Sequence, residues 1–112
     1  MNMKIIMALA VALSPSITKA DECTSAGCIS TIESLYTNSS GLIYISTPLD
    51  ETKANCTAYA GNYFVLNPES PNAKEIYSSL LAAYMSDSKI QLRINEGSPN
   101  CELAYVRLNK NF

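Results

Sequence analysis

Three residue types in this chain could carry chemistry: it has four cysteines, seven tyrosines and ten acidic residues, and it has no histidine. Histidine is the commonest general base and metal ligand in proteins. Its absence excludes Ser-His-Asp and Cys-His sites for nucleophilic catalysis. No phosphate-binding glycine loop and no calcium-loop pattern occurs in the sequence. The sequence therefore predicts a protein that is not an enzyme, with no catalytic residue, no metal site and no cofactor.

The adjacent acids Asp50 and Glu51 could form a carboxylate pair in a loop that also contains a proline. Adjacent acids in such loops are usually solvated, so we assign this pair no catalytic role. The acids Glu33, Glu96 and Glu102 show no recognisable acid–base spacing.

The four cysteines are expected to form two disulfides. They all follow a predicted secretory leader, and an even number of cysteines in an oxidising compartment is typical of a disulfide framework. A zinc site is the alternative, but the spacing lacks paired C-x2-C motifs. Of the three possible connectivities, we prefer Cys56–Cys101 between strands and Cys23–Cys28 around a local N-terminal loop.

The tyrosines are the best candidates for binding a ligand, because tyrosine combines a flat apolar ring with a polar hydroxyl. Tyr77 and Tyr84 fall on the apolar face of a predicted helix, and the other five fall on predicted strands. Tyrosine is also favoured in strands for purely structural reasons. We therefore select the residues around a predicted bend as candidate ligand contacts: Tyr59, Asn62 and Tyr63.

One helix is expected after residue 70. Ser70 is a good N-cap, and Pro71 suits the first helical position, where its missing N–H costs nothing. The helix should end within residues 86–88. Its apolar residues recur at helical spacing and predict one continuous face that packs on the core. These residues are Ala73, Ile76, Tyr77, Leu80, Leu81, Tyr84 and Met85.

Five strands are expected, at residues 28–37, 41–47, 57–67, 89–95 and 101–108. The first breaks strict alternation, which indicates a bulge or strong coiling. The third contains a bend at Gly61 and Asn62, the fourth alternates cleanly, and the fifth should place Leu103 on the same face as Tyr105. The order β-β-β-α-β-β predicts a mainly β, α+β fold of the OB type, a five-stranded Greek-key barrel. An open antiparallel sheet with one helix across it is the alternative.

Residues 1–20 have the features of a secretory signal peptide, with Lys4 before an apolar run and small residues, Thr18 and Ala20, before the cleavage point. The apolar run, residues 5–13, is much shorter than the ~20 residues that span a bilayer. Residues 21–112 are expected to form one disulfide-stabilised domain, secreted or periplasmic. Six of the eight basic residues and all ten acidic residues lie in this domain, which gives a net charge of −4. This charge argues against binding nucleic acid or anionic lipid.

The stretch SSLLAAYMSDSKIQLRINEGSPNC, residues 78–101, resembles the helix, turn and penultimate strand of the Shiga-toxin B subunit. The binding subunits of cholera toxin and subtilase cytotoxin share that architecture. Residues 21–112 also resemble a group of small secreted proteins of Gram-negative bacteria, at residues 41–45, 56–66, 80–83 and 101–108. The Shiga-type subunit has one disulfide and no cysteine that matches Cys56, and none of its glycan-contact residues carries over to this chain.

The resemblance implies an OB-like fold and a non-catalytic module that binds a glycan or a receptor. Such a module could assemble as a ring, for example a pentamer, through its exposed strand edges. The second hypothesis is a monomeric periplasmic accessory or inhibitor protein that binds another protein. The expected partner is therefore a glycan or a protein, with no membrane insertion after signal cleavage.

Overall fold

The computed structural model describes residues 20–112, which form a mainly β fold with one α-helix. The predicted signal peptide lies outside these residues except for Ala20. No helix in the described part is long and apolar enough to cross a membrane. The elements in chain order are β1 (Glu22–Thr24), β2 (Gly27–Ser30), β3 (Ser34–Thr37), β4 (Ile43–Ser46), the 3-10 helix η1 (Glu51–Lys53), β5 (Phe64–Leu66), α1 (Ala73–Ser86), β6 (Ile90–Ile94) and β7 (Leu103–Leu108).

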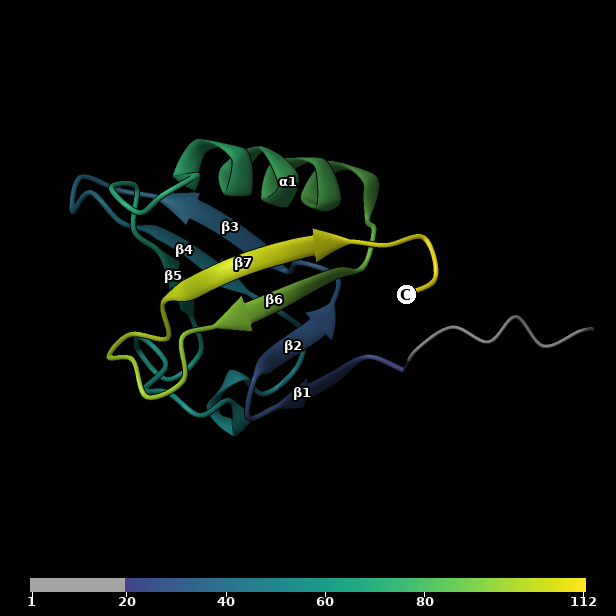
Figure 1. Ribbon diagram of the computed structural model, residues 1–112, viewed down its shortest axis with the longest axis horizontal. Helices are drawn as coiled ribbons and strands as arrows, with labels where there is room; N and C mark the ends of the chain where they lie inside the picture. Colours follow the sequence, from purple (N-terminus) through teal and green to yellow (C-terminus); the bar gives the residue numbers. More distant parts are fainter. Residues whose placement is uncertain (1–19) are drawn as a thin grey trace, which may run out of the picture.

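The strands form two antiparallel sheets, in the spatial orders β1-β2-β6-β7 and β3-β4-β5. A short break between β2 and β3 carries the chain from the first sheet to the second (Figure 1). One isolated parallel bridge joins Val65 of β5 to Glu102, the residue before β7, and β5 and β7 form no continuous ladder. Residues 20–112 therefore confirm a mainly β fold with one helix, arranged as two sheets without a closed barrel.

The single strand expected over residues 28–37 is wrong, because two strands, β2 and β3, occupy this stretch. Ile32 lies in the break between them, is 5% exposed and belongs to the core. The N–H of Glu33 donates to the carbonyl of Ser46 at 2.8 Å, so the chain already follows the second sheet there. The irregular apolar spacing reflects this change of sheet. An unexpected strand, β1, pairs with β2 in a hairpin.

The strand expected over residues 57–67 is much shorter, since β5 begins only at Phe64. The bend predicted inside it is a tight turn. Ala60 and Gly61 have positive φ angles of 51° and 81°, and the turn brings Tyr59 and Tyr63 into a single antiparallel bridge. The chain therefore doubles back before it enters the sheet.

The last two strands show how a bulge changes the faces of a strand. β6 alternates as predicted, with Ile90, Leu92 and Ile94 buried. A register shift between Arg93 and Ile94 leaves Ala104 as an extra residue in β7. Leu103 is therefore buried while Tyr105 is exposed, so the expectation that they share a face is wrong.

Helix α1 lies across one side of the molecule and packs against β7 and β3 (Figure 1). Its buried stripe is narrower than the predicted apolar face and consists of Ala73, Ile76, Leu80 and Ala83. Tyr77 is partly buried against the core. Three residues expected in the core are exposed instead, and they flank the stripe on one side: Leu81, Tyr84 and Met85.

The helix begins two residues later than the expected cap. Asn72 occupies the N-cap position with a left-handed backbone and forms no side-chain capping hydrogen bond. The hydroxyl of Ser70 donates instead to the carbonyl of Asn67 in the preceding turn, so it is not available to cap the helix. The predicted end is confirmed, because α1 stops at Ser86 and Asp87 adopts the left-handed conformation.

Two disulfides hold the loops against this framework, with the pairing preferred from the sequence. Cys23–Cys28 closes the β1–β2 hairpin, with 4.0 Å between the Cα atoms. Cys56–Cys101 ties the loop before β5 to the start of β7, with 5.0 Å between the Cα atoms. Two disulfides are typical of a protein that folds in an oxidising compartment.

Candidate functional site: a tyrosine cluster

The candidate residues Tyr59 and Tyr63 lie at the two ends of the tight turn before β5. The N–H of Tyr59 donates to the carbonyl of Tyr63 at 2.9 Å, and the N–H of Tyr63 donates to the carbonyl of Tyr59 at 3.0 Å. Asn62 lies between them, exposed, and its N–H donates to the carbonyl of Tyr59. The three candidates therefore belong to one small, hydrogen-bonded loop.

Two further tyrosines complete the site. Tyr36 of β3 and Tyr44 of β4 are direct partners in the antiparallel ladder. Their rings stack with centroids 4.7 Å apart and an interplanar angle of 17°. Tyr44 is 1% exposed but does not belong to the hydrophobic core cluster, whereas its strand neighbour Ile45 does. Because side chains alternate along a strand, Tyr36 and Tyr44 lie on the face of the sheet that points away from the core.

The turn places its two rings against this stacked pair. Tyr63 meets Tyr36 edge-on at 5.4 Å and Tyr44 at 6.0 Å. Tyr59 is tilted against Tyr44 at 4.9 Å and is 39% exposed. These separations are within the range in which aromatic pairs attract each other. We call the group Tyr36, Tyr44, Tyr59 and Tyr63 the tyrosine cluster.

Polar groups converge on the hydroxyl of Tyr44. The hydroxyls of Ser40 and Tyr44 are 2.9 Å apart, and either can be the donor. The single hydroxyl proton of Ser40 can point to Tyr44 or to the side-chain oxygen of Asn38. Hydrogen bonds from Ser40, Tyr59 and Asn38 lower the pKa of Tyr44, with Ser40 the largest cause. The hydrogen bond to Tyr44 raises the pKa of Tyr59, so the hydroxyl of Tyr59 is the donor in that pair.

A tyrosine titration should report this network. We expect one tyrosine to ionise below the ordinary pKa of 10.0, and Ser40→Ala to move this ionisation to higher pH by removing its main cause. The measurement is the phenolate absorbance of the folded protein as a function of pH. Identical titration curves for Ser40→Ala and the wild type would contradict the assigned hydrogen bond.

The same pKa shifts give the direction in which each tyrosine changes the stability of the fold at alkaline pH. Burial is the main cause that raises the pKa of Tyr36, and the pKa of Tyr59 is raised as well. The stability that these two raised pKa values contribute to the folded state is complete below pH 10. It is lost as pH rises through the pKa values of Tyr36 and Tyr59 in the folded protein. The lowered pKa of Tyr44 acts in the opposite direction, because its contribution is present above pH 10 and is lost as pH falls through the folded value.

The acids considered from the sequence have structural partners. Glu51 is 3% exposed, and its carboxylate accepts hydrogen bonds from the N–H and the hydroxyl of Thr47 at 2.6 and 3.0 Å. Asp50 caps η1 by accepting from the N–H of Thr52. Hydrogen bonds from the side chain and the backbone of Thr52 lower the pKa of Asp50. The expectation that both acids are solvated is therefore wrong for Glu51.

Sequence reasoning missed half of the tyrosine cluster, although a signal for it was present. Tyr36 and Tyr44 are equally distant in sequence from Ser40, which lies in the turn between the strands predicted over residues 28–37 and 41–47. A hairpin centred on that turn places them opposite each other. In contrast, no sequence pattern indicates that the turn at Tyr59–Tyr63 folds over this pair.

The tyrosine cluster and its polar neighbours Asn38, Ser40 and Asn62 offer uncharged rings, hydroxyls and amides, which suits recognition by stacking and hydrogen bonding. Within residues 20–112, no group of three or more cysteine, aspartate or glutamate side chains is arranged to hold a metal ion. Comparisons of the chain with protein-family models, curated proteins and solved structures find no match.

Proposed function

We propose that residues 21–112 form a secreted, non-catalytic binding module of a Gram-negative bacterium, which recognises a glycan through the tyrosine cluster. The observation that carries this proposal is the convergence of four aromatic rings and two polar loops on one face of the β3-β4-β5 sheet. Two disulfides and a predicted signal peptide support its secretion or its location in the periplasm.

The chemistry of a sugar matches this surface. A pyranose ring has an apolar face of C–H groups, and tyrosine offers a flat ring with a polar tip. The exposed ring of Tyr59 provides the stacking surface. Exposed amides at Asn38 and Asn62 provide donors and acceptors for the sugar hydroxyls. Tyr44 contacts the exposed ring of Tyr59, and Tyr36 stacks on Tyr44.

The proposed fold is an OB-like barrel that is open between β5 and β7. Three features support it: the passage of one chain segment from β2 into β3, the helix between β5 and β6, and the parallel bridge between Val65 and Glu102. The exposed edges of such a barrel also support assembly into a ring of identical subunits, for which we propose a pentamer.

The test of this function uses the oxidised protein exported by a Gram-negative host. A glycan array should give saturable binding to a restricted set of sugars, and light scattering coupled to size exclusion should give the mass of about five protomers. A monomer that binds sugars would overturn the ring and leave the glycan proposal standing. A protein that binds no sugar on the array would overturn glycan recognition.

Replacing Tyr59 with alanine should weaken binding to the best glycan about ten-fold, since the exposed stacking surface is lost. The matched control is Tyr105→Ala, which removes a tyrosine of similar exposure, 46%, from β7. The control should bind as the wild type does in calorimetric titrations. Equal losses for the two variants would contradict a specific role of the tyrosine cluster.

One observation favours a second function, a monomeric periplasmic accessory or inhibitor protein. The flank of α1 that faces solvent exposes three large apolar side chains: Leu81 at 42%, Tyr84 at 42% and Met85 at 75%. Aromatic residues and methionine are enriched in protein interfaces. Under this alternative, Met85→Asp would abolish co-purification of a periplasmic protein and Tyr59→Ala would not.

A further inference from the structure

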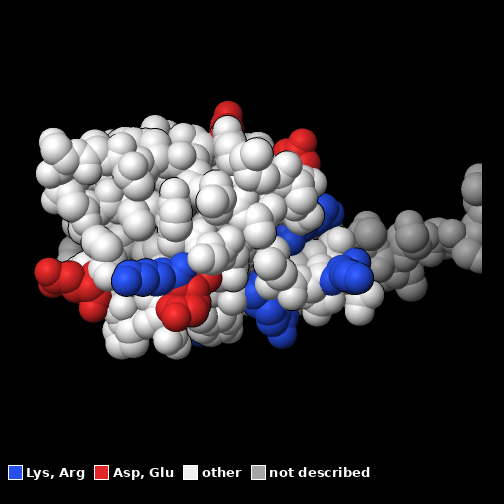
Figure 2. Space-filling view, turned by 90° about the horizontal axis from the view of Figure 1, so that it is seen from above, with Lys and Arg blue, Asp and Glu red and all other residues white. Residues whose placement is uncertain are grey.

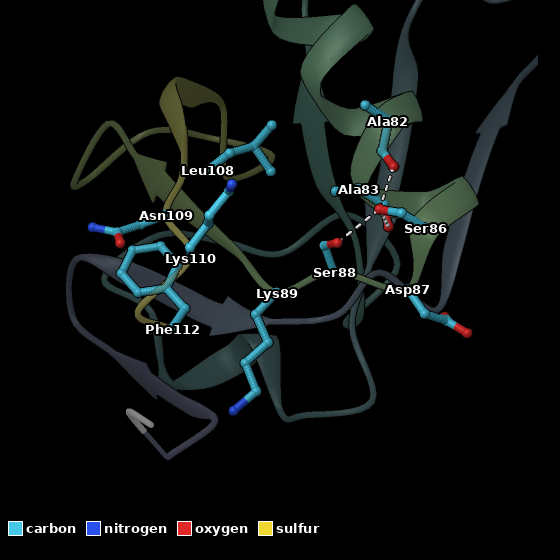
Figure 3. Close-up of a pocket in the computed structure, with 10 residues that line it drawn as sticks. All are labelled: Ala82, Ala83, Ser86, Asp87, Ser88, Lys89, Leu108, Asn109, Lys110 and Phe112. Carbon is cyan, nitrogen blue, oxygen red and sulfur yellow. Dashed lines mark hydrogen bonds between the residues drawn. The ribbon is translucent and has the colours of Figure 1, made fainter. Parts of the chain in front are cut away.

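A separate hollow of about 550 Å³ lies between the end of α1, the start of β6 and the segment that follows β7 (Figure 3). This volume is within the range of small-molecule sites, roughly 300–1,000 Å³. None of its lining residues belongs to the tyrosine cluster. No sequence pattern indicates this hollow, because it forms where residues 82–89 meet the distant segment 108–112.

One wall is the last turn of α1, where the polar groups already have partners. The hydroxyl of Ser86 donates to the carbonyl of Ala82 at 2.7 Å and lies 2.7 Å from the hydroxyl of Ser88. The N–H of Ser88 donates to the carbonyl of Ala83. Ala83 is 1% exposed and belongs to the core, so the apolar side chain that this wall offers to a ligand is that of Ala82, which is exposed.

The opposite wall is formed by Leu108, Asn109, Lys110 and Phe112 (Figure 3). Leu108 is 47% exposed, although it lies in a strand. The guanidinium of Arg107 lies 5.5 Å from the centre of the Phe112 ring. An apolar ligand group could pack between Leu108 and the exposed Ala82 of α1.

Basic side chains gather around this hollow in a domain that is acidic overall. Lys89, Arg107 and Lys110 are three of its six basic residues. On the face seen in Figure 2, most of the basic side chains lie towards the right-hand end, where α1 and the chain finish. The acids that face this group are Asp87, which lines the hollow, and Asp21, which pairs with Lys89 at 2.8 Å.

We propose that this hollow binds a small amphiphilic anion, an acyl or aryl group that carries one carboxylate or phosphate. The apolar part packs against Ala82 and Leu108, and the anionic head lies near the ammonium of Lys110. Lys110 is exposed and forms no ion pair within residues 20–112. Its charge is therefore available to a ligand without the loss of an existing salt bridge.

The experiment is an NMR titration of the ¹⁵N-labelled, oxidised protein with octanoate. We expect saturable shifts confined to the amides of residues 82–89 and 108–112. Octanamide has the same chain without the charge, and acetate and inorganic phosphate have a charge without the chain. Each of these three probes should bind more weakly than octanoate. Equal binding of octanamide, or of acetate or phosphate, would overturn the amphiphile proposal.

Two variants locate the site. Lys110→Glu should weaken octanoate binding about five-fold, as expected for reversing one exposed charge near the head group. Lys74→Glu makes the same charge change at the other end of α1, where Lys74 is also exposed, and should leave binding unchanged. Equal weakening by both variants would overturn the placement.

A variant of a different kind fills the hollow with a larger side chain and leaves the core unaltered. Ala82 is exposed on α1 and lines the hollow, so Ala82→Phe should block the ligand while the rest of the amide spectrum stays that of the wild type. Octanoate affinity unchanged in Ala82→Phe would overturn the proposal, whatever the Lys110 variant does. These readouts do not depend on glycan binding by the tyrosine cluster.

Discussion

Replacement of Cys56 and Cys101 by alanine is expected to lower the free energy of unfolding by about 4 kcal/mol, because the disulfide closes a long loop. The two cysteines are 45 residues apart in sequence, so the cross-link removes many conformations from the unfolded chain. Cys101 is also fully buried in the core. A domain of this size has roughly 5–15 kcal/mol of total stability, so the loss is a large fraction of it.

The matched control is the double alanine replacement of Cys23 and Cys28. Their separation is only 5 residues, for which the same loop-closure argument gives about 2 kcal/mol. That disulfide clamps β1, an edge strand with one neighbour. Urea denaturation followed by circular dichroism measures the free energy of unfolding of both double variants. A loss in the Cys23/Cys28 variant equal to or larger than that in the Cys56/Cys101 variant would contradict this account.

Gly27→Ala is expected to destabilise the protein by about 3 kcal/mol or more, through backbone strain and overpacking together. Gly27 has a φ angle of +135°, which residues with a Cβ atom rarely adopt. A Cβ atom placed there would lie 1.9 Å from the carbonyl oxygen of Leu92. Gly27 pairs with Arg93 between β2 and β6, in the middle of the four-stranded sheet. The clash is with backbone, so the strands must separate to relieve it.

Gly97→Ala is the control for Gly27→Ala. Gly97 also has a positive φ angle, +79°, but a Cβ there would meet no atom within 4 Å. Its replacement should cost only the strain of a left-handed residue, about 1 kcal/mol. The denaturant midpoints of the two variants measure the difference. Similar midpoints would show that close packing at Gly27 contributes nothing.

Local patterns predicted the elements that depend on local physics. The alternation of Ile90, Leu92 and Ile94 predicted β6, and the helical spacing from Ala73 predicted α1 and its end. The burial of each helix face depends on what packs against it. The sheets cover only the stripe that contains Ile76 and Leu80, so the neighbouring apolar residues, including Met85, are exposed. Sequence periodicity carries no information on the width of the surface behind a helix.

The part of the candidate site that depends on local sequence was predicted, and the part that depends on tertiary contacts was not. The bend at Gly61 was visible because glycine indicates where a chain can turn. The contact between the turn and the Tyr36–Tyr44 pair is a tertiary contact that joins two hairpins, and no local pattern reports it. The break between β2 and β3 was likewise visible as irregular spacing, but its cause, a change of sheet, was not.

The NMR footprint of the glycan that binds best on the array shows directly whether the tyrosine cluster recognises the ligand. We expect amide shifts confined to residues 36–44 and 58–65, the two segments that build the cluster. Shifts confined instead to α1 and β7 would show that the ligand binds elsewhere and would overturn recognition by the tyrosine cluster.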